Sequence, residues 1–222
     1  MLYIENMLLI RSTLVLIFLA FAPVAEADWQ LKKEQDGIKV YTGQSPQPNI
    51  KAVRVECEIK TTLSRLAALL FDAPAHEDWI YSTEESYEVE RINEQEQIYY
   101  SEITMPWPLY NREVVIHLKI HQDPQTHVMT VTATATKGYV DESKDKVRVT
   151  SSQAIWTVTP TGKETVKVEY VGWANPGGAV PAWAVNLFAT KGPYESFRKL
   201  RALVNKPVYQ AANLPFIKNY RG

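Results

Sequence analysis

The four histidines are the side chains of this 222-residue chain that a metal ion would need first. His117 and His121 lie four residues apart in a stretch that alternates like a β-strand, so they stand about 13 Å apart at the usual rise. A zinc ion holds its ligands at about 2 Å. The spacing therefore predicts no metal site at these histidines.

No catalytic constellation is recognisable along the chain. Neither a Ser-His-Asp nor a Cys-His arrangement can be assigned, and there is no nucleophile elbow or phosphate-binding loop. His76-Glu77-Asp78 contains groups that donate and accept protons, but we interpret it as a solvated loop at the beginning of a strand. Cys57, the only cysteine, is expected to be a small buried side chain rather than a reactive thiol. The sequence predicts a protein that is not an enzyme and has no cofactor.

The segment Met105–Glu113, MPWPLYNRE, is more informative. Two prolines stiffen it and it presents four bulky side chains, as loops do that cover a pocket or touch a membrane surface. The alternative is a structural crossover whose aromatic residues are tucked in. Arg112 follows the loop at the start of an apolar strand, where a buried guanidinium needs a carboxylate or backbone carbonyls as partners. We therefore expect Arg112 to be a structural anchor.

The elements that must position this loop are mostly strands. Apolar and polar residues alternate with the period of a strand that has one wet face. A change of parity between Val149 and Ala154 indicates a bulge near Ser151–Gln153. Two short helices are expected, at Trp29–Gln35 and at Thr62–Phe71 with Thr61 or Thr62 as its cap. The main predicted strands are Lys51–Lys60, Tyr81–Ile92, Gln97–Met105, Arg112–Gln122, Val128–Thr136 and Thr165–Gly172.

A long helix is predicted between Pro181 and Val204, because bulky apolar residues recur there at steps of three and four. Gly192-Pro193 should kink this helix, since proline removes one backbone hydrogen bond. About seven antiparallel strands with one polar face must cover their other face, and this helix is the obvious cover. Alanines and tryptophans are mixed on the surfaces that should meet. They can pack solidly or leave an apolar cavity between sheet and helix.

Composition limits the remaining possibilities. Residues 1–27 have the layout of a secretory signal, with Ala25-Glu26-Ala27 ahead of Asp28, so export to the periplasm or secretion is expected. The alternative is an uncleaved N-terminal anchor. The formal net charge is −1, which argues against binding to nucleic acid. Residues 28–205 are interpreted as one domain and 206–222 as an extended tail along its body. The expected state is a monomer.

These segments together resemble the START (StAR-related lipid transfer) domain family. The proline-rich loop ending in Arg112-Glu113 looks like the family's Pro-x-x-x-Arg-Asp pattern at the start of a central strand. Trp79 looks like its tryptophan after the first long helix. The resemblance covers about Trp29–Val204. The segment that leads into the family's C-terminal helix looks like the one formed here by Asn175–Gly178, Pro181, Trp183, Asn186 and Gly192-Pro193.

The resemblance implies an α+β helix-grip fold, in which a curved antiparallel sheet of about seven to nine strands wraps around a long C-terminal helix. It also implies an internal apolar cavity for one lipid or sterol-like molecule, with the loop Met105–Tyr110 near its mouth and Arg112 and Glu113 as anchors. With the inward parity of the strands, the expected ligand-binding residues are Met105, Trp107, Val114, Ile116, Leu118, Val131, Ala133, Trp156, Val168, Tyr170, Trp173, Trp183, Leu187 and Phe188.

Two positions depart from the family pattern. Glu113 stands where the family has aspartate, and Leu118 stands about where members that hold a charged or polar head group often have arginine. We therefore expect a ligand more apolar than a phospholipid.

The function expected from these observations is non-catalytic binding, and transfer, of one lipid or other hydrophobic small molecule, with transient contact to a membrane surface. Two other interpretations stay open: an enzyme of the helix-grip superfamily, such as a cyclase or hydrolase acting on an apolar substrate, and a purely structural or partner-binding domain. The absent catalytic constellation and the apolar lining favour the first.

Overall fold

Ten strands form one sheet in the computed structural model, which describes residues 28–220. Nine of them are antiparallel neighbours in the order β1-β2-β3-β10-β9-β7-β6-β5-β4, and the short β8 pairs in parallel with β6. The strands are β1 (Gln30–Gln35), β2 (Ile38–Gln44), β3 (Lys51–Ile59), β4 (Thr83–Asn93), β5 (Glu96–Ile103), β6 (Arg112–Gln122), β7 (Met129–Ala135), β8 (Val147–Arg148), β9 (Ser152–Gly162) and β10 (Thr165–Ala174).

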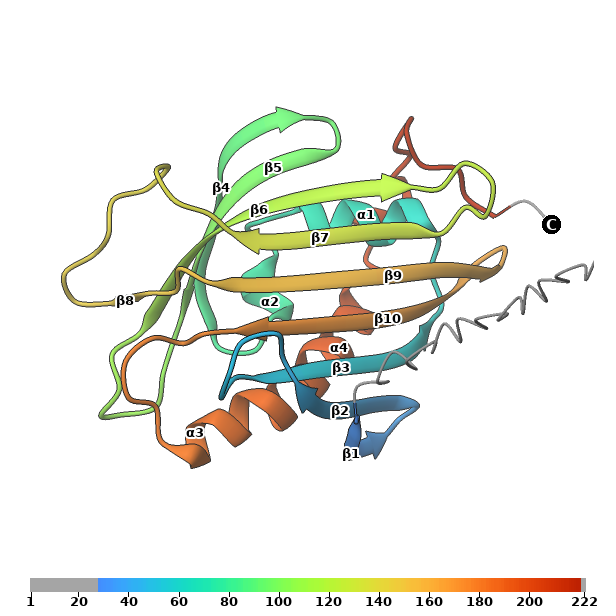
Figure 1. Cartoon of the computed structure of the whole chain (residues 1–222). Helices are drawn as coiled ribbons and strands as arrows, with labels where there is room; N and C mark the ends of the chain where they lie inside the picture. Colours follow the sequence, from blue (N-terminus) through green and yellow to red (C-terminus); the bar gives the residue numbers. More distant parts are fainter. Residues whose placement is uncertain (1–27, 221–222) are drawn as a thin grey trace, which may run out of the picture.

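The sheet curves around helices that lie behind it in the view of Figure 1, while the start of the C-terminal helix, coloured orange, lies below the sheet. This is the predicted helix-grip arrangement, with one strand more than the largest number expected. Thr62 caps the first helix by accepting a hydrogen bond from the Arg65 N–H at 3.3 Å. The helical elements are α1 (Leu63–Phe71), α2 (His76–Trp79), α3 (Ala182–Asn186), the π-helical turn η1 (Leu187–Lys191), α4 (Gly192–Leu203) and α5 (Pro207–Gln210).

The expected helix at Trp29–Gln35 is wrong, because this stretch forms β1 and pairs with β2. Asp36 and Gly37 have φ angles of 52° and 67° and join the two strands directly. Positive φ at both central residues is the geometry of the tightest hairpin turns, for which Asp-Gly is strongly preferred. The turn therefore overrides the helix-forming composition of the residues before it.

The bulge expected near Ser151–Gln153 is also wrong. The pairing of β9 with β10 is regular from the pair Ser152–Ala174 to the pair Pro160–Val166. The parity of the inward-facing residues changes because β8 and β9 are separate strands with different partners. β8 pairs with β6, and the Val149 N–H, just after β8, still donates to the Glu113 carbonyl oxygen at 2.8 Å. The chain then crosses over to pair with β7.

The C-terminal helix begins at Ala182, with Pro181 as its cap residue, and runs through η1 into α4. The predicted kink takes the form of a π-helical turn that ends where Gly192-Pro193 begins. A wider turn accommodates a proline that cannot donate to the preceding carbonyls. A Cβ on Gly192 would lie 3.2 Å from the Tyr81 ring, so the close approach of this ring favours glycine.

The chain after α4 is not simply extended as expected. It forms α5, and the Tyr209 hydroxyl donates to Asp72 at 2.7 Å. Asn219 then accepts a hydrogen bond from the Ser64 N–H at 3.0 Å, so the tail is fastened to the start of α1. The predicted signal segment, residues 1–27, lies outside the described residues. Within residues 28–220, no helix is long and apolar enough to cross a membrane.

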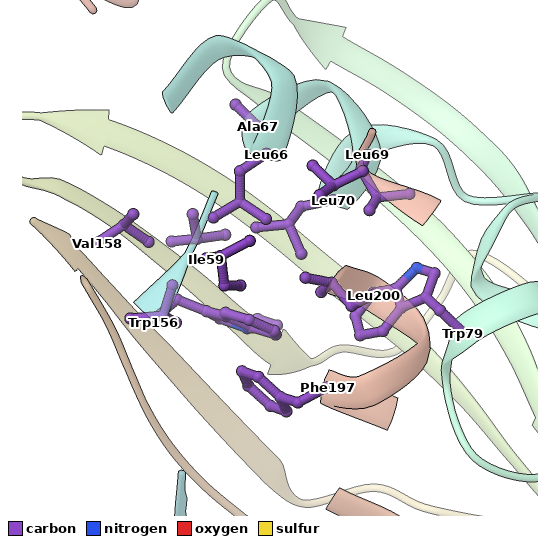
Figure 2. Packing of buried hydrophobic residues seen from close by; sticks show 14 of the residues in the cluster. Ile59, Leu66, Ala67, Leu69, Leu70, Trp79, Trp156, Val158, Phe197 and Leu200 are labelled. Carbon is purple, nitrogen blue, oxygen red and sulfur yellow. The ribbon is translucent and has the colours of Figure 1, made fainter. Parts of the chain in front are cut away.

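The main hydrophobic core lies between the concave face of the sheet and the helices α1, α2 and α4. Figure 2 shows its centre, where Trp156 from the sheet meets Trp79 from α2 and Phe197 from α4. The alternation predicted for β6 is confirmed, because Val114, Ile116, Leu118 and Ile120 all belong to this core. The opposite face of β5 and β6 carries a small second cluster around Val115.

Candidate functional site

Arg112 joins two loops at one end of the sheet. Its side chain is buried and donates to the carbonyl oxygens of Tyr110 at 2.6 Å, Pro176 at 3.2 Å and Gly177 at 3.2 Å. Tyr110 belongs to the loop between β5 and β6, and the other two belong to the loop between β10 and α3. A guanidinium presents several donors in a rigid fork, which suits three carbonyls at once.

Arg112→Ala is expected to lower the free energy of unfolding by about 3 kcal/mol, because three carbonyls lose a charged donor. Urea denaturation measures this loss. Arg198→Ala, at an exposed position of α4, is the control and should change stability by less than about 0.5 kcal/mol. Unchanged stability of Arg112→Ala with a selective loss of ligand binding would instead assign Arg112 to the ligand.

Glu113 points to the convex face of the sheet, where it meets Arg148. The two side chains are only 2% and 5% exposed, and Glu113 Oε1 lies 3.0 Å from Arg148 Nη2. Glu113 also accepts hydrogen bonds from the Ser143 N–H at 2.9 Å and the Tyr100 hydroxyl at 3.1 Å. Burial, and then this bond to Glu113, raises the pKa of Tyr100 to about 12.

Arg148 was not expected to have any role. It donates to the carbonyl oxygens of Val140 at 3.0 Å and Asp141 at 2.8 Å, in addition to its contact with Glu113. Lys146 forms a further ion pair with Glu102. The segment between β7 and β8 is therefore fastened to the convex face of the sheet by buried charges.

Three large aromatic side chains are exposed near Arg112. Trp107 is 90% exposed and Tyr110 is 69% exposed in the β5–β6 loop, and Trp183 is 51% exposed on the first turn of α3. Trp107 and Tyr110 share the loop that Arg112 holds, and Trp183 follows closely on the second loop that it holds. These aromatic residues thus gather at the same end of the sheet.

The interior contains a connected aromatic cluster. The rings of Trp156 and Phe197 are stacked with centroids 4.9 Å apart, and Tyr170 contacts both at 5.0 and 5.8 Å. Trp79 meets Trp156 edge-on at 6.1 Å. The cluster joins β9 and β10 to α2 and α4, so it bridges the sheet and the C-terminal helix at this point.

A row of short side chains crosses the concave face next to this cluster. Strand register places Ala133, Ala154 and Gly172 side by side on β7, β9 and β10, and the larger Leu118 of β6 stands at the end of the row beside Ala133. A Cβ on Gly172 would lie 2.3 Å from the Tyr170 hydroxyl oxygen, so only glycine lets the phenol lie over this row. Ala154 and Tyr170 pack against the core but are not fully buried.

The structure brings together most of the predicted ligand-binding residues. Tyr170 packs against the core cluster, Met105 is buried at the start of the loop, and Leu187 and Phe188 are half-buried in the π-helical turn. Seven residues belong to the core cluster itself: Val114, Ile116, Leu118, Val131, Ala133, Trp156 and Val168.

Three predicted residues do not line the interior. Trp107 and Trp183 face solvent, because one sits between two prolines in an exposed loop and the other on the first turn of a helix. Trp173 lies one residue from the inward-facing Gly172 on β10, so strand alternation sends its side chain to the convex face.

A cleft of about 510 Å³ lies at a different place, at the C-terminal end of α1. It is lined by residues of α1 and β4 and by Leu214 and Phe216 of the tail. None of the predicted ligand-binding residues contributes to it.

His76 is buried rather than solvated, which corrects the interpretation of His76-Glu77-Asp78 as a loop. The helix α2 turns His76 and Trp79 to the core and leaves Glu77 and Asp78 exposed. His76 Nε2 lies 3.1 Å from the Leu70 carbonyl oxygen, to which the neutral ring donates. Burial lowers the pKa of His76 to about 4.

This burial predicts a pH-dependent stability. The unfolded chain takes up a proton at His76 near pH 6.5 but the folded chain only near pH 4, so stability falls as the pH drops through this window, by about 3 kcal/mol. His76→Gln keeps a donor for Leu70 and does not titrate. Urea denaturation at pH 7 and pH 4.5 should show a smaller loss for the variant. An equal loss in both proteins would contradict the assignment.

Comparison with known proteins agrees with this geometry. The family model of the START domain matches residues 10–209. The chain belongs to the START domain family. This START protein is 32% identical over 183 residues to an uncharacterized protein of Pseudomonas aeruginosa, covering 81% of this chain and 88% of the relative. It is 29% identical over 177 residues to the human phosphatidylcholine transfer protein, covering 76% and 80% of the two chains.

Solved structures show the same fold. The STAR-related lipid transfer protein of Xanthomonas axonopodis, a fragment of residues 25–204, superimposes with a TM-score of 0.72 at 29% identity. The match covers 80% of this START protein and 99% of the fragment. Human STARD10 superimposes with a TM-score of 0.71 at 20% identity, covering 88% and 80% of the two chains.

Proposed function

We propose that this START protein binds one hydrophobic lipid between its sheet and its C-terminal helix, and carries it without catalysis. The observation that carries the proposal is the aromatic cluster of Trp79, Trp156, Tyr170 and Phe197 beside the row of short side chains. Rings and a shallow apolar row suit an elongated apolar molecule. Relatives named as lipid transfer proteins support the same class of ligand.

Lipid exchange between two vesicle populations tests this function. Donor vesicles carry a fluorescent lipid with a quencher, and acceptor vesicles carry neither. Transfer should rise in proportion to protein concentration, and protein separated from the vesicles should retain the label. Absence of both transfer and retained label, over several lipid classes, would contradict the proposal.

We also infer that the exposed aromatic residues touch a membrane while lipid enters or leaves. Tryptophan and tyrosine favour the boundary between water and lipid, because each has an apolar body and a polar tip. Trp107 and Trp183 lie at the end of the sheet where Arg112 joins the two loops. The route inward would pass the β5–β6 loop and the π-helical turn, which lacks regular α-helical hydrogen bonds.

Trp107→Ala tests this contact. Since Trp107 is almost fully exposed, the variant should keep its stability and its affinity for lipid but exchange lipid with vesicles about tenfold more slowly. Tyr220→Ala is the control and should exchange lipid at the unmodified rate, because it removes an exposed aromatic residue from the tail, which meets Gln122 at the other end of β6. Equal exchange rates for Trp107→Ala and the unmodified protein would place the membrane contact elsewhere.

Residues 1–27 support a second, separate proposal, that the protein is exported and matures at Asp28. The short apolar run and the Ala25-Glu26-Ala27 sequence are typical of a cleaved secretory signal. Sequencing the N-terminus of exported protein tests this, and recovery of Met1 would contradict it.

A further inference from the structure

Gln97 is a fully buried polar residue on the concave face of β5. Its side chain has no exposed surface, and neither its amide nitrogen nor its amide oxygen forms a hydrogen bond within residues 28–220. A primary amide has two donors and an acceptor, and leaving them buried without partners destabilises the fold. A buried amide of this kind therefore requires an explanation.

Strand register places Gln97 at the end of the row of short side chains. It is the neighbour of Leu118, which is followed by Ala133, Ala154 and Gly172 across the sheet. An apolar chain lying along this row would bring its end to the amide of Gln97. The row and the amide thus form one continuous surface.

Gln97 has one charged neighbour: its partner on β4 is Arg91, which forms an ion pair with Glu88 and packs over the Phe71 ring. The aromatic groups nearby are polar but uncharged. Tyr99 lies two residues further on the same face of β5, and its ring contacts His76 at 4.8 Å. His76 in turn meets Trp79 at 5.7 Å, and the indole N–H of Trp79 is buried without a partner among residues 28–220. Burial keeps the pKa of His76 low, and burial raises the pKa of Tyr99, so both side chains are neutral near pH 7.

The buried charges of the described chain are already engaged elsewhere. Arg112 binds three backbone carbonyls, Glu113 pairs with Arg148, and Glu102 pairs with Lys146. Arg91 is already paired with Glu88 at the partly exposed edge of the sheet, so a phosphate or ammonium group brought to Gln97 would be buried without a free counter-charge, which is strongly unfavourable. A hydroxyl both donates and accepts one hydrogen bond, so it satisfies both ends of the amide.

We propose that Gln97 determines ligand specificity by binding the hydroxyl group of an uncharged lipid alcohol, such as a diacylglycerol. This inference rests on the proposed function and narrows its substrate class. Tyr99, on the same face of β5, supplies a further uncharged hydrogen-bonding group. The acyl chains lie along Leu118, Ala133 and Ala154, up to the Tyr170 phenol that covers Gly172.

The test compares dioleoylglycerol with its methyl ether, in which the hydroxyl is capped, and with dioleoylphosphatidylcholine. Each is labelled and presented to the full chain in otherwise identical vesicles, and the label retained by the protein is measured. The unmodified protein should prefer the alcohol to the ether by about tenfold, and should prefer it to phosphatidylcholine.

Gln97→Met keeps the length of the side chain and removes its polar atoms. It should reduce the preference for the alcohol over the ether to less than twofold, keep the binding of the ether, and leave the melting temperature unchanged or higher. Gln97→Leu is a second variant with the same expected result. Gln95→Met, the same change in the β4–β5 turn, should behave like the unmodified protein.

Two outcomes would overturn the assignment of Gln97: full preference for the alcohol in both Gln97 variants, or no preference in the unmodified protein while it still binds lipid. If the unmodified protein retained none of the three probes or any other lipid class, the proposed function itself would be wrong.

Discussion

Glu113→Gln is expected to lower the free energy of unfolding by about 3 kcal/mol or more. The substitution keeps the shape of the side chain but removes its charge, and Arg148 is then left as a cation whose side chain is only 5% exposed. Removing one partner of a buried pair costs more than the pair itself contributes, because the remaining charge is desolvated without compensation. Urea denaturation at neutral pH measures the change.

The double variant Glu113→Gln with Arg148→Met separates charge from shape. It should regain part of the lost stability, since no unpaired charge remains, although the carbonyls of Val140 and Asp141 lose their donor. Glu94→Gln, an exposed position in the β4–β5 turn, is the single-site control. A loss below about 1 kcal/mol for Glu113→Gln would mean that water reaches Arg148 and that the segment between β7 and β8 is not held by this pair.

Ala133→Trp is expected to abolish lipid binding. Ala133 faces the core between Leu118 and Ala154, and the next residue along the row is Gly172, so an indole there would occupy the space proposed for the ligand. If that space is available, the fold should lose at most about 2 kcal/mol, because the new side chain replaces ligand rather than protein. Binding of a fluorescent lipid and thermal unfolding measure the two effects.

Thr134→Trp is the matched control, because the next residue on β7 points to the convex face and is exposed. It should bind lipid normally. An Ala133→Trp protein that stays folded and binds lipid with unchanged affinity would place the ligand outside the row. A variant that fails to fold would show that the interior is a solid core with no space to fill.

The strands and the C-terminal helix could be predicted from the sequence because their apolar residues follow the period of their own backbone. Arg112–Gln122 was predicted with the bounds of β6, and the interruption of the helix was expected beside Gly192-Pro193. The exceptions had local causes. The Asp36-Gly37 turn makes the residues before it a strand of a hairpin rather than a helix. Near Ser151, the change from β8 to β9, which have different partners, produces the same change of parity as a bulge.

The site was less predictable, because its essential features depend on contacts between distant segments. The position of Arg112 at the start of an apolar strand predicts that its guanidinium needs partners. It does not predict that these partners are the carbonyl groups of residues 110, 176 and 177. Arg148 lies in a polar stretch without a period, so nothing marked it as buried. Gln97 lies two residues from Tyr99 on the same face of β5, so the alternation of this strand predicts that Gln97 is buried.

The most direct test of the central claim is native mass spectrometry of the full chain, with Ala133→Trp measured beside it. After incubation with lipid vesicles and separation from them, the unmodified protein should carry one lipid molecule per chain, and Ala133→Trp should carry none. If the unmodified protein carried no lipid, or if Ala133→Trp carried the same amount as the unmodified protein, the claim that one lipid binds between the sheet and the C-terminal helix would be contradicted.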